Sequence, residues 1–318
     1  MRFVGNPAYH MHPPLSLLFI AVASFACSCA HADAAEPSPR VTTDIPFLAP
    51  DRAEKLDLYL PETPPAGKLS PAVVWIHGGG WAGGTKNEAR AKNICGILAR
   101  AGYVAVSVDY RLGEGAWPTN LFDCKNAVRF LRSHAAEYHL DPNRIAVAGG
   151  SAGGHLALMV ALTADRAGFE PPGAGTPYAG VSSAVRCVIN MYGITNLNTR
   201  QQTDAKGQPT GTRKPLGTAL KVFGATDDTA DVLRLASPVT YVAKNSPPIL
   251  TRHGSADITV DFAQAEELER VARERGARHE LMLLDGVGHT FDWETWRKSP
   301  LPGDVKSTAL AFLASNMK

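Results

Sequence analysis

The segment 149–153, with the sequence GGSAG, constrains the fold of this chain more than any other stretch. It fits the pattern G-x-S-x-G. The mostly apolar run 144–148 before it is typical of a buried strand, and the apolar run 154–162 after it is typical of a helix. Glycines remove the Cβ clashes that would prevent a tight turn between the two. The sequence therefore predicts that Ser151 is exposed at the carboxyl end of a strand, directly before a helix.

Apolar runs alternate with segments of helical spacing along the rest of the chain. The predicted strands are 54–60, 72–76, 103–108, 144–148, 186–191, 248–252 and 280–284, and the predicted helices are 87–101, 120–138, 154–162, 261–274 and 305–316. Strands that are apolar throughout are typical of a sheet buried on both faces. The alternation predicts an α/β fold, with a mostly parallel central sheet and helices on both sides. The polar and apolar residues of 54–60 alternate, which predicts an edge strand.

The N-terminus is predicted to be a secretory signal peptide over residues 1–32. Its apolar stretch, 15–26, is too short to span a bilayer, and Ala-His-Ala at 30–32 fits a cleavage site, with 32–34 as the second choice. An uncleaved anchor and a lipoprotein attached at Cys27 or Cys29 are the alternatives. We expect a secreted or periplasmic protein with no membrane span after cleavage, a Pro-rich arm over 33–52 and one catalytic domain over 53–318.

The net charge bears on the expected partners of the chain, and the cysteines bear on disulfides and metal sites. The net charge is +2 and no basic run is present, so we expect no nucleic-acid or anionic-membrane partner. Three cysteines follow the predicted cleavage site, namely Cys95, Cys124 and Cys187, so at least one is unpaired. No Cys/His cluster predicts a metal site. The sequence selects neither a disulfide pair nor an oligomeric state.

Two irregular segments interrupt the alternation, at about 164–182 and 196–231. Both are polar or rich in Gly and Pro, with a short helix predicted near 218–223. Long irregular insertions in a domain of this kind are often functional. We expect both to form a cap or rim at the carboxyl ends of the strands; surface loops without a role are the alternative.

A serine hydroxyl needs a base within hydrogen-bond reach, and that base needs an acid to orient it. Reactive groups of an open parallel sheet lie on loops at the carboxyl ends of its strands. Asp257 follows the strand 248–252 and His289 follows 280–284, which gives the order Ser, Asp, His. We predict Ser151 as nucleophile, His289 as general base and acid, and Asp257 as the group that orients His289. The alternatives for the acid are Asp261, Asp285 and Asp292.

Backbone donors for an oxyanion are predicted at the segment 77–80, with the sequence HGGG, directly after a buried strand. The donors would be the N–H groups of Gly79, Gly80 and Ala152. A flexible turn is the alternative. Four aromatic residues are candidates either for the substrate pocket or for the core: Trp81, Tyr110, Trp117 and Tyr192. We expect structural roles for His155 and His253.

These motifs make the chain resemble an α/β-hydrolase over residues 53–316. Within that fold it is similar to the carboxylesterases related to hormone-sensitive lipase, and more so to the branch that holds acetyl-xylan and feruloyl esterases. The resemblance rests on HGGGW at 77–81, DYR at 109–111, GGSAGGHLA at 149–157, HGSAD at 253–257 and GH at 288–289. Many relatives of hormone-sensitive lipase have an acidic residue where this chain has Gly150. That difference, and the absence of an evident N-terminal helical cap, favour the branch with a more open site.

The resemblance implies an exported serine esterase that needs no cofactor or metal. Its substrates would be short acyl or hydroxycinnamoyl esters, free or on plant polysaccharide, cleaved through an acyl-serine intermediate. A serine peptidase of the oligopeptidase type, a polyester or lipid-ester hydrolase on the same fold, and a non-catalytic binding protein are the alternatives.

Overall fold

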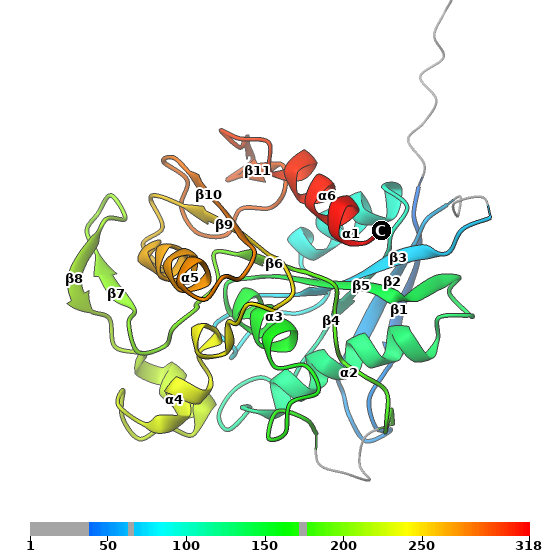
Figure 1. The fold of residues 1–318 in the computed structure, drawn as a ribbon, viewed down its shortest axis with the longest axis horizontal. Helices are drawn as coiled ribbons and strands as arrows, with labels where there is room; N and C mark the ends of the chain where they lie inside the picture. Colours follow the sequence, from blue (N-terminus) through cyan, green and yellow to red (C-terminus); the bar gives the residue numbers. More distant parts are fainter. Residues whose placement is uncertain (1–37, 63–66, 172–176) are drawn as a thin grey trace, which may run out of the picture. The chain divides into compact units, whose positions relative to one another are not determined.

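An eight-stranded sheet forms the centre of the computed structural model, which describes residues 38–62, 67–171 and 177–318 (Figure 1). The strand order is β1-β2-β4-β3-β5-β6-β9-β10. Their bounds are β1 Arg40–Pro46, β2 Lys55–Leu60, β3 Ser70–Ile76, β4 Val104–Val108, β5 Leu140–Gly150, β6 Val188–Met191, β9 Ile249–Gly254 and β10 His279–Leu284. The six strands from β4 to β10 pair in parallel, and β1 and β2 run antiparallel at one edge. The predicted, mostly parallel sheet is confirmed.

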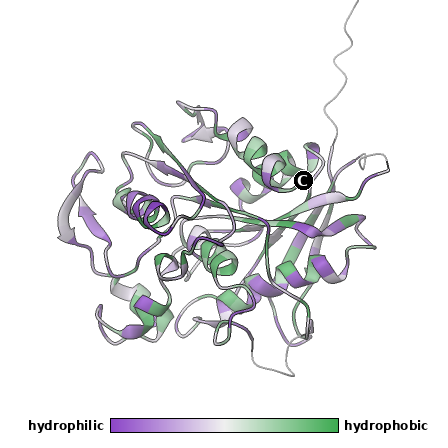
Figure 2. Ribbon diagram, in the orientation of Figure 1, coloured by the Kyte–Doolittle hydropathy of each residue, from purple (hydrophilic) through white to green (hydrophobic). Residues whose placement is uncertain are grey.

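Helices cover both faces of this sheet (Figure 1). Their bounds are α1 Ala89–Arg100, α2 Thr119–Ser133, α3 Ala152–Leu162, α4 Asp231–Leu235, α5 Ala263–Glu274 and α6 Val305–Asn316. One apolar cluster includes residues of α2, α3 and α5, and a second includes residues of α1 and α6. Figure 2 shows the central strands as largely hydrophobic, as expected for strands covered on both sides.

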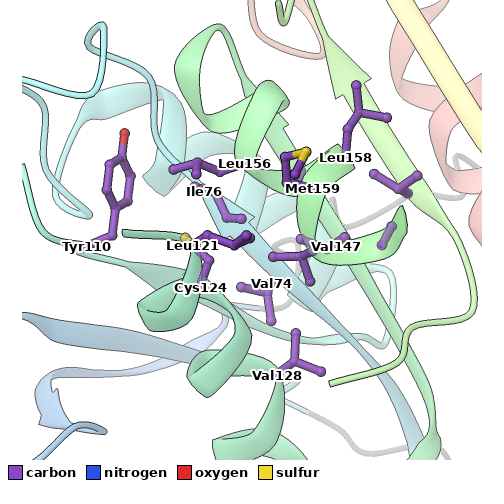
Figure 3. Packing of buried hydrophobic residues seen from close by; sticks show 14 of the residues in the cluster. Val74, Ile76, Tyr110, Leu121, Cys124, Val128, Val147, Leu156, Leu158 and Met159 are labelled. Atoms are coloured by element: carbon purple, nitrogen blue, oxygen red, sulfur yellow. The ribbon is translucent and has the colours of Figure 1, made fainter. Parts of the chain in front are cut away.

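Strand β3 shows why an apolar run becomes a central strand. Its side chains alternate between the two faces, so Val74 and Ile76 belong to the cluster under α2 and α3, whereas Val73 and Trp75 belong to the cluster under α1 and α6. Figure 3 shows Val74 and Ile76 among side chains of α2 and α3, including Val128 and Leu156. All four β3 side chains are fully buried. This packing fixes the carboxyl end of β3, where the HGGG segment begins.

The prediction of an N-terminal arm over 33–52 is wrong for residues 40–46. Residues 40–46 form β1, which pairs with β2 and is the true edge strand, so the predicted edge strand 54–60 is flanked on both sides. The described residues from 38 onwards form one compact unit, which begins before the predicted boundary at 53. The predicted signal peptide lies outside the described residues. No helix within the described ranges is both long and apolar enough to cross a membrane.

The described residues of the segment 164–182, which are 164–171 and 177–182, do not lie at the predicted place. The segment follows the last turn of α3, whereas Ser151 precedes the first turn, and a helix of this length spans about 16 Å. Its described residues bind α2 instead: Glu170 accepts from Lys125 at 2.6 Å and also pairs with Arg129, and the carbonyl of Val181 accepts from Arg129 at 2.8 Å. A connection from a helix to the next parallel strand must return to the amino end of that strand. The prediction of a rim over the carboxyl ends is therefore wrong for the described residues of this segment.

The segment 196–231 forms a small substructure of its own. It contains the two-stranded hairpin β7 (Gln201–Thr203) and β8 (Pro209–Arg213), and the 3-10 helix η2 (Gly217–Phe223), close to the predicted short helix. After it come α4 and a second 3-10 helix, η3 (Pro238–Tyr241). A final hairpin, β11 (Thr295–Trp296) and β12 (Ser299–Pro300), follows β10. Cys95, Cys124 and Cys187 are buried free thiols.

Candidate active site

Ser151 lies on a strained turn between β5 and α3. Its φ of 57° and ψ of −123° fall outside the regions that a residue with a side chain ordinarily adopts. The turn packs closely on the end of β3, since a Cβ added to Gly153 would lie 2.1 Å from the Ile76 oxygen and 2.4 Å from the His77 oxygen. The Ser151 N–H donates to the Met191 oxygen at 2.9 Å. The sequence GGSAG folds this way because residues with larger side chains do not fit against β3 at position 153.

The structure brings the three predicted triad residues together. Ser151 Oγ lies 2.9 Å from His289 Nε2, and His289 Nδ1 lies 2.6 Å from Asp257 Oδ2. Asp257 follows β9 and His289 follows β10, so adjacent parallel strands deliver both to the edge of the sheet at which Ser151 lies. An ionised carboxylate can only accept, so Nδ1 carries the proton and Nε2 is free to accept from the serine hydroxyl.

Asp257 is fully buried and held as a carboxylate. Burial raises the pKa of this carboxyl, but hydrogen bonds from His253 and His289 outweigh burial and leave the pKa well below its usual range. Its second oxygen accepts from the backbone N–H groups of Thr259, at 2.8 Å, and Val260, at 2.9 Å. The alternative acids have other partners: Asp261 accepts from Gln201, Asp285 from Ser255 and Asp292 from Glu294.

His253 was predicted to be structural, and the structure adds a contact with the triad. Its Nε2 donates to the Val260 oxygen at 2.9 Å and lies 3.4 Å from Asp257 Oδ2. Because a carbonyl only accepts, this nitrogen carries the proton and faces the carboxylate as a second donor. The sequence signal for this contact is the spacing of four residues between His253 and Asp257 in HGSAD. It does not predict the contact, because the sequence does not give the shape of the turn between them.

The HGGG segment lies directly beside the serine. A Cβ at Gly78 would be 3.2 Å from the Ser151 Cβ, and Gly79 and Gly80 are exposed with φ of 114° and 62°. Within the part of the chain that the structure describes, the N–H groups of Gly79, Gly80 and Ala152 donate to no backbone oxygen. His77 holds the segment by donating from Nδ1 to the Gly78 oxygen at 2.6 Å. The three predicted donors are thus available next to Ser151.

Among the described residues, no group of three or more His, Cys, Asp or Glu side chains lies together as a metal site requires. The family model BD-FAE matches residues 56–271, more than half of the chain. The chain belongs to the BD-FAE family. The predicted family, α/β-hydrolase carboxylesterases related to hormone-sensitive lipase, is confirmed.

Individual relatives agree with the BD-FAE assignment. Esterase LipC of Mycobacterium tuberculosis (strain ATCC 25618 / H37Rv) is 31% identical over 245 residues, which are 76% of this chain and 58% of LipC. A truncated carbohydrate esterase from gut microbiota superimposes with a TM-score of 0.74 at 25% identity, over 89% of this chain and 98% of the other. Esterase 2 of Thermogutta terrifontis, phosphoramylated by tabun, gives a TM-score of 0.66 at 26% identity, over 88% and 95%. The chain spans about three fifths of the length of the curated relatives.

Three of the four candidate pocket aromatics of this BD-FAE chain are buried. Trp81, Tyr110 and Tyr192 are at most 2% exposed, and only Trp117 is partly exposed. Tyr110 stacks on the ring of His77 at 4.4 Å and donates its hydroxyl to the His77 oxygen at 3.0 Å. Burial leaves Trp81, Tyr110 and Tyr192 little surface for a substrate, and Trp117 keeps part of its surface exposed.

His155 of α3 connects the oxyanion segment to a distant part of the BD-FAE chain. Its Nε2 donates to the Ala236 oxygen at 2.7 Å, so its Nδ1 accepts from Trp81 Nε1 at 3.2 Å. The ring is fully buried, as expected of a structural histidine. Burial lowers the pKa of His155 to about 4.

This low pKa predicts a loss of stability in mild acid. Below pH 6.5 the unfolded His155 binds a proton that the folded one does not bind until about pH 4, so the free energy of unfolding falls as the pH falls through this window. A shift of this size corresponds to about 3 kcal/mol. His155→Gln does not titrate. We expect its unfolding free energy, from urea titrations between pH 4 and 7, to depend less on pH than that of the wild type by about this amount. Parallel curves would contradict the assignment.

The segment 196–231 holds the loop that carries Asp257. The Gly207 turn of the β7–β8 hairpin packs on it, because a Cβ there would lie 2.5 Å from Ala256 Cα. Three side chains of the segment donate to backbone oxygens of that loop: Gln208 to Ser255, Lys214 to Ile258 and Thr259, and Arg200 to Thr259. The predicted position beside the site therefore fits this segment, in contrast to 164–182.

Proposed function

We propose that this protein hydrolyses carboxylic esters through an acyl-Ser151 intermediate. The observation that carries the proposal is a chain of two hydrogen bonds, from Ser151 to His289 at 2.9 Å and from His289 to Asp257 at 2.6 Å. It lies beside N–H groups of the HGGG segment that donate to no backbone oxygen within the described residues. Both parts are required for acyl transfer, since one activates the nucleophile and the other binds the charge that develops on the substrate. Esterase names among the relatives support the same reaction.

The reaction proceeds in two halves. Ser151 Oγ attacks the acyl carbon while His289 Nε2 takes its proton, and the N–H groups of Gly79, Gly80 and Ala152 bind the resulting oxyanion. The C–O bond then breaks as His289 returns the proton to the leaving alcohol. Water, deprotonated by His289, attacks the acyl-enzyme, and the proton returns to Ser151 Oγ as the acid leaves.

We further propose short acyl or hydroxycinnamoyl esters as substrates, with plant polysaccharide as the natural carrier. The exposed glycines of the oxyanion segment support an open site, which a polymer requires. The carbohydrate esterase among the structural relatives supports the same class. A signal peptide over 1–32 would place the enzyme outside the cytoplasm; N-terminal sequencing of exported protein should find a mature chain that starts near residue 33.

A substrate panel tests the proposal. We expect p-nitrophenyl acetate to be hydrolysed faster than the octanoate, and acetate or ferulate to be released from acetylated xylan or methyl ferulate. A peptidase of the oligopeptidase type would instead cleave aminoacyl-p-nitroanilides, and a lipid-ester or polyester hydrolase would favour the octanoate. Absence of ester hydrolysis together with no reaction with a fluorophosphonate probe would indicate a non-catalytic binding protein.

A further inference from the structure

Tyr192 lies behind the active site, between the serine turn and the histidine loop. It directly follows β6, and its N–H donates to the Arg252 oxygen at 2.7 Å. Its φ of 43° is left-handed, which is uncommon for a residue with a bulky side chain. The side chain is fully buried. Backbone strain of this kind persists only where the surrounding contacts fix the residue, so the contacts of the Tyr192 side chain must hold it in this conformation.

The Tyr192 side chain contacts the histidine loop twice. Its hydroxyl donates to the Phe291 oxygen at 2.7 Å, and its ring meets the His289 ring edge to face, with centroids 4.9 Å apart. Between these two residues lies Thr290, which also has a left-handed φ, of 67°. A loop with such a residue needs hydrogen bonds from other parts of the chain to keep one conformation. Tyr192 supplies one of them, and Trp296 supplies a second, since its Nε1 donates to the His289 oxygen at 3.2 Å.

The same side chain occupies the space next to Gly150. A Cβ at Gly150 would lie 2.8 Å from the Tyr192 hydroxyl oxygen and 3.0 Å from its Cε2. The first distance is shorter than a Cβ contact tolerates, and the second is tighter than most Cβ contacts. The residue before the nucleophile therefore has no side chain because the tyrosine ring takes its place. The absence of an acidic residue at this position thus has a local structural cause.

We propose that Tyr192 is a positioning residue, which holds His289 against Ser151 through the Phe291 carbonyl and which requires glycine at position 150. The proposal rests on the proposed ester hydrolysis. Burial raises the pKa of the Tyr192 hydroxyl, so the hydroxyl stays protonated and able to donate. Small displacements of a catalytic group lower the rate of the chemical step more than substrate binding. Loss of the hydroxyl should therefore change kcat and spare KM.

Tyr192→Phe tests the proposal. We expect kcat for p-nitrophenyl acetate to fall about tenfold with KM within about twofold, and the rate of phosphorylation by paraoxon to fall by the same factor, because both reactions need His289 as base. Tyr241→Phe is the matched control, since the Tyr241 hydroxyl likewise donates to a backbone oxygen, that of Leu235, at 2.7 Å. The control should keep the wild-type kcat. Equal losses in the two variants, or no loss in Tyr192→Phe, would overturn the proposal.

A double-mutant cycle gives a second readout that does not depend on one variant. Gly150→Ala should lower kcat in the wild type by pushing the tyrosine away, and should cost a smaller factor in a Tyr192→Phe background, where the nearest atom is gone. Equal factors in both backgrounds would contradict the coupling. A wild type without ester hydrolysis contradicts the proposed function, whereas an active wild type with unchanged variants contradicts only the role of Tyr192.

Discussion

Ser151→Ala should lower kcat for p-nitrophenyl acetate by about 10⁶, in line with other serine triads. The variant lacks the only atom that His289 Nε2 faces at hydrogen-bond distance within the described residues, so no acyl-enzyme can form. What hydrolysis is left would come from the oxyanion donors alone. Assays with the purified variant measure the loss of kcat. Labelling with a fluorophosphonate probe separately measures the loss of the nucleophile.

Ser315→Ala is the matched control for this variant. Ser315 is exposed on α6, and its hydroxyl donates to the Phe312 oxygen of the same helix. We expect wild-type kcat and full labelling. If Ser151→Ala kept a kcat near that of the wild type while folded by circular dichroism, the nucleophile would be another residue and the proposed mechanism would be wrong.

Gly153→Ala should destabilise the fold and abolish activity together. The added Cβ would meet the Ile76 and His77 carbonyl oxygens at 2.1 and 2.4 Å, and both belong to backbone that the buried strand β3 holds in place. The turn must move away from β3, which separates Ser151 from the oxyanion segment. We expect a loss of more than about 3 kcal/mol, at the upper end for overpacked sites. Thermal unfolding should show a fall of Tm by about 5 °C or more.

Gly96→Ala controls for the change from glycine to alanine. Gly96 lies inside α1, where the nearest atom to an added Cβ is the end of the flexible Arg100 side chain, 3.4 Å away. Alanine favours a helix over glycine by about 1 kcal/mol, so this variant should be as stable as the wild type or more. A Gly153→Ala protein with wild-type Tm and kcat would show that the turn can relax without cost.

The sequence predicted those features that depend on position along the chain. Asp257 and His289 could be assigned because the loops after parallel strands meet at one edge, and few acids or histidines follow a strand after Ser151. The predicted rim is wrong for the described residues of 164–182 because this segment follows helix α3, whereas the loops at the carboxyl ends of the sheet follow strands. Strand β1 escaped prediction because its side chains are mostly exposed and carry no apolar alternation.

Contacts between side chains distant in sequence could not be predicted. Nothing in the sequence places the ring of Tyr192 against Gly150, forty-two positions away, although the sequence does show glycine where many relatives have an acidic residue. The aromatic residues near the motifs could equally have lined a pocket or filled the core. The packing decides this, and it buries Trp81, Tyr110 and Tyr192.

The bonds that hold the Asp257 loop have a consequence for how the surface of this protein can diversify. Gln208, Lys214 and Arg200 all bind main-chain oxygens of that loop, and main-chain atoms are present whatever residues the loop contains. Ile258, next to the triad acid, leaves 58% of its surface exposed. Its side chain is thus free to be exchanged while the carboxylate stays in register. Selection, or a mutant library, can remodel the surface beside the triad at this position without disturbing its geometry.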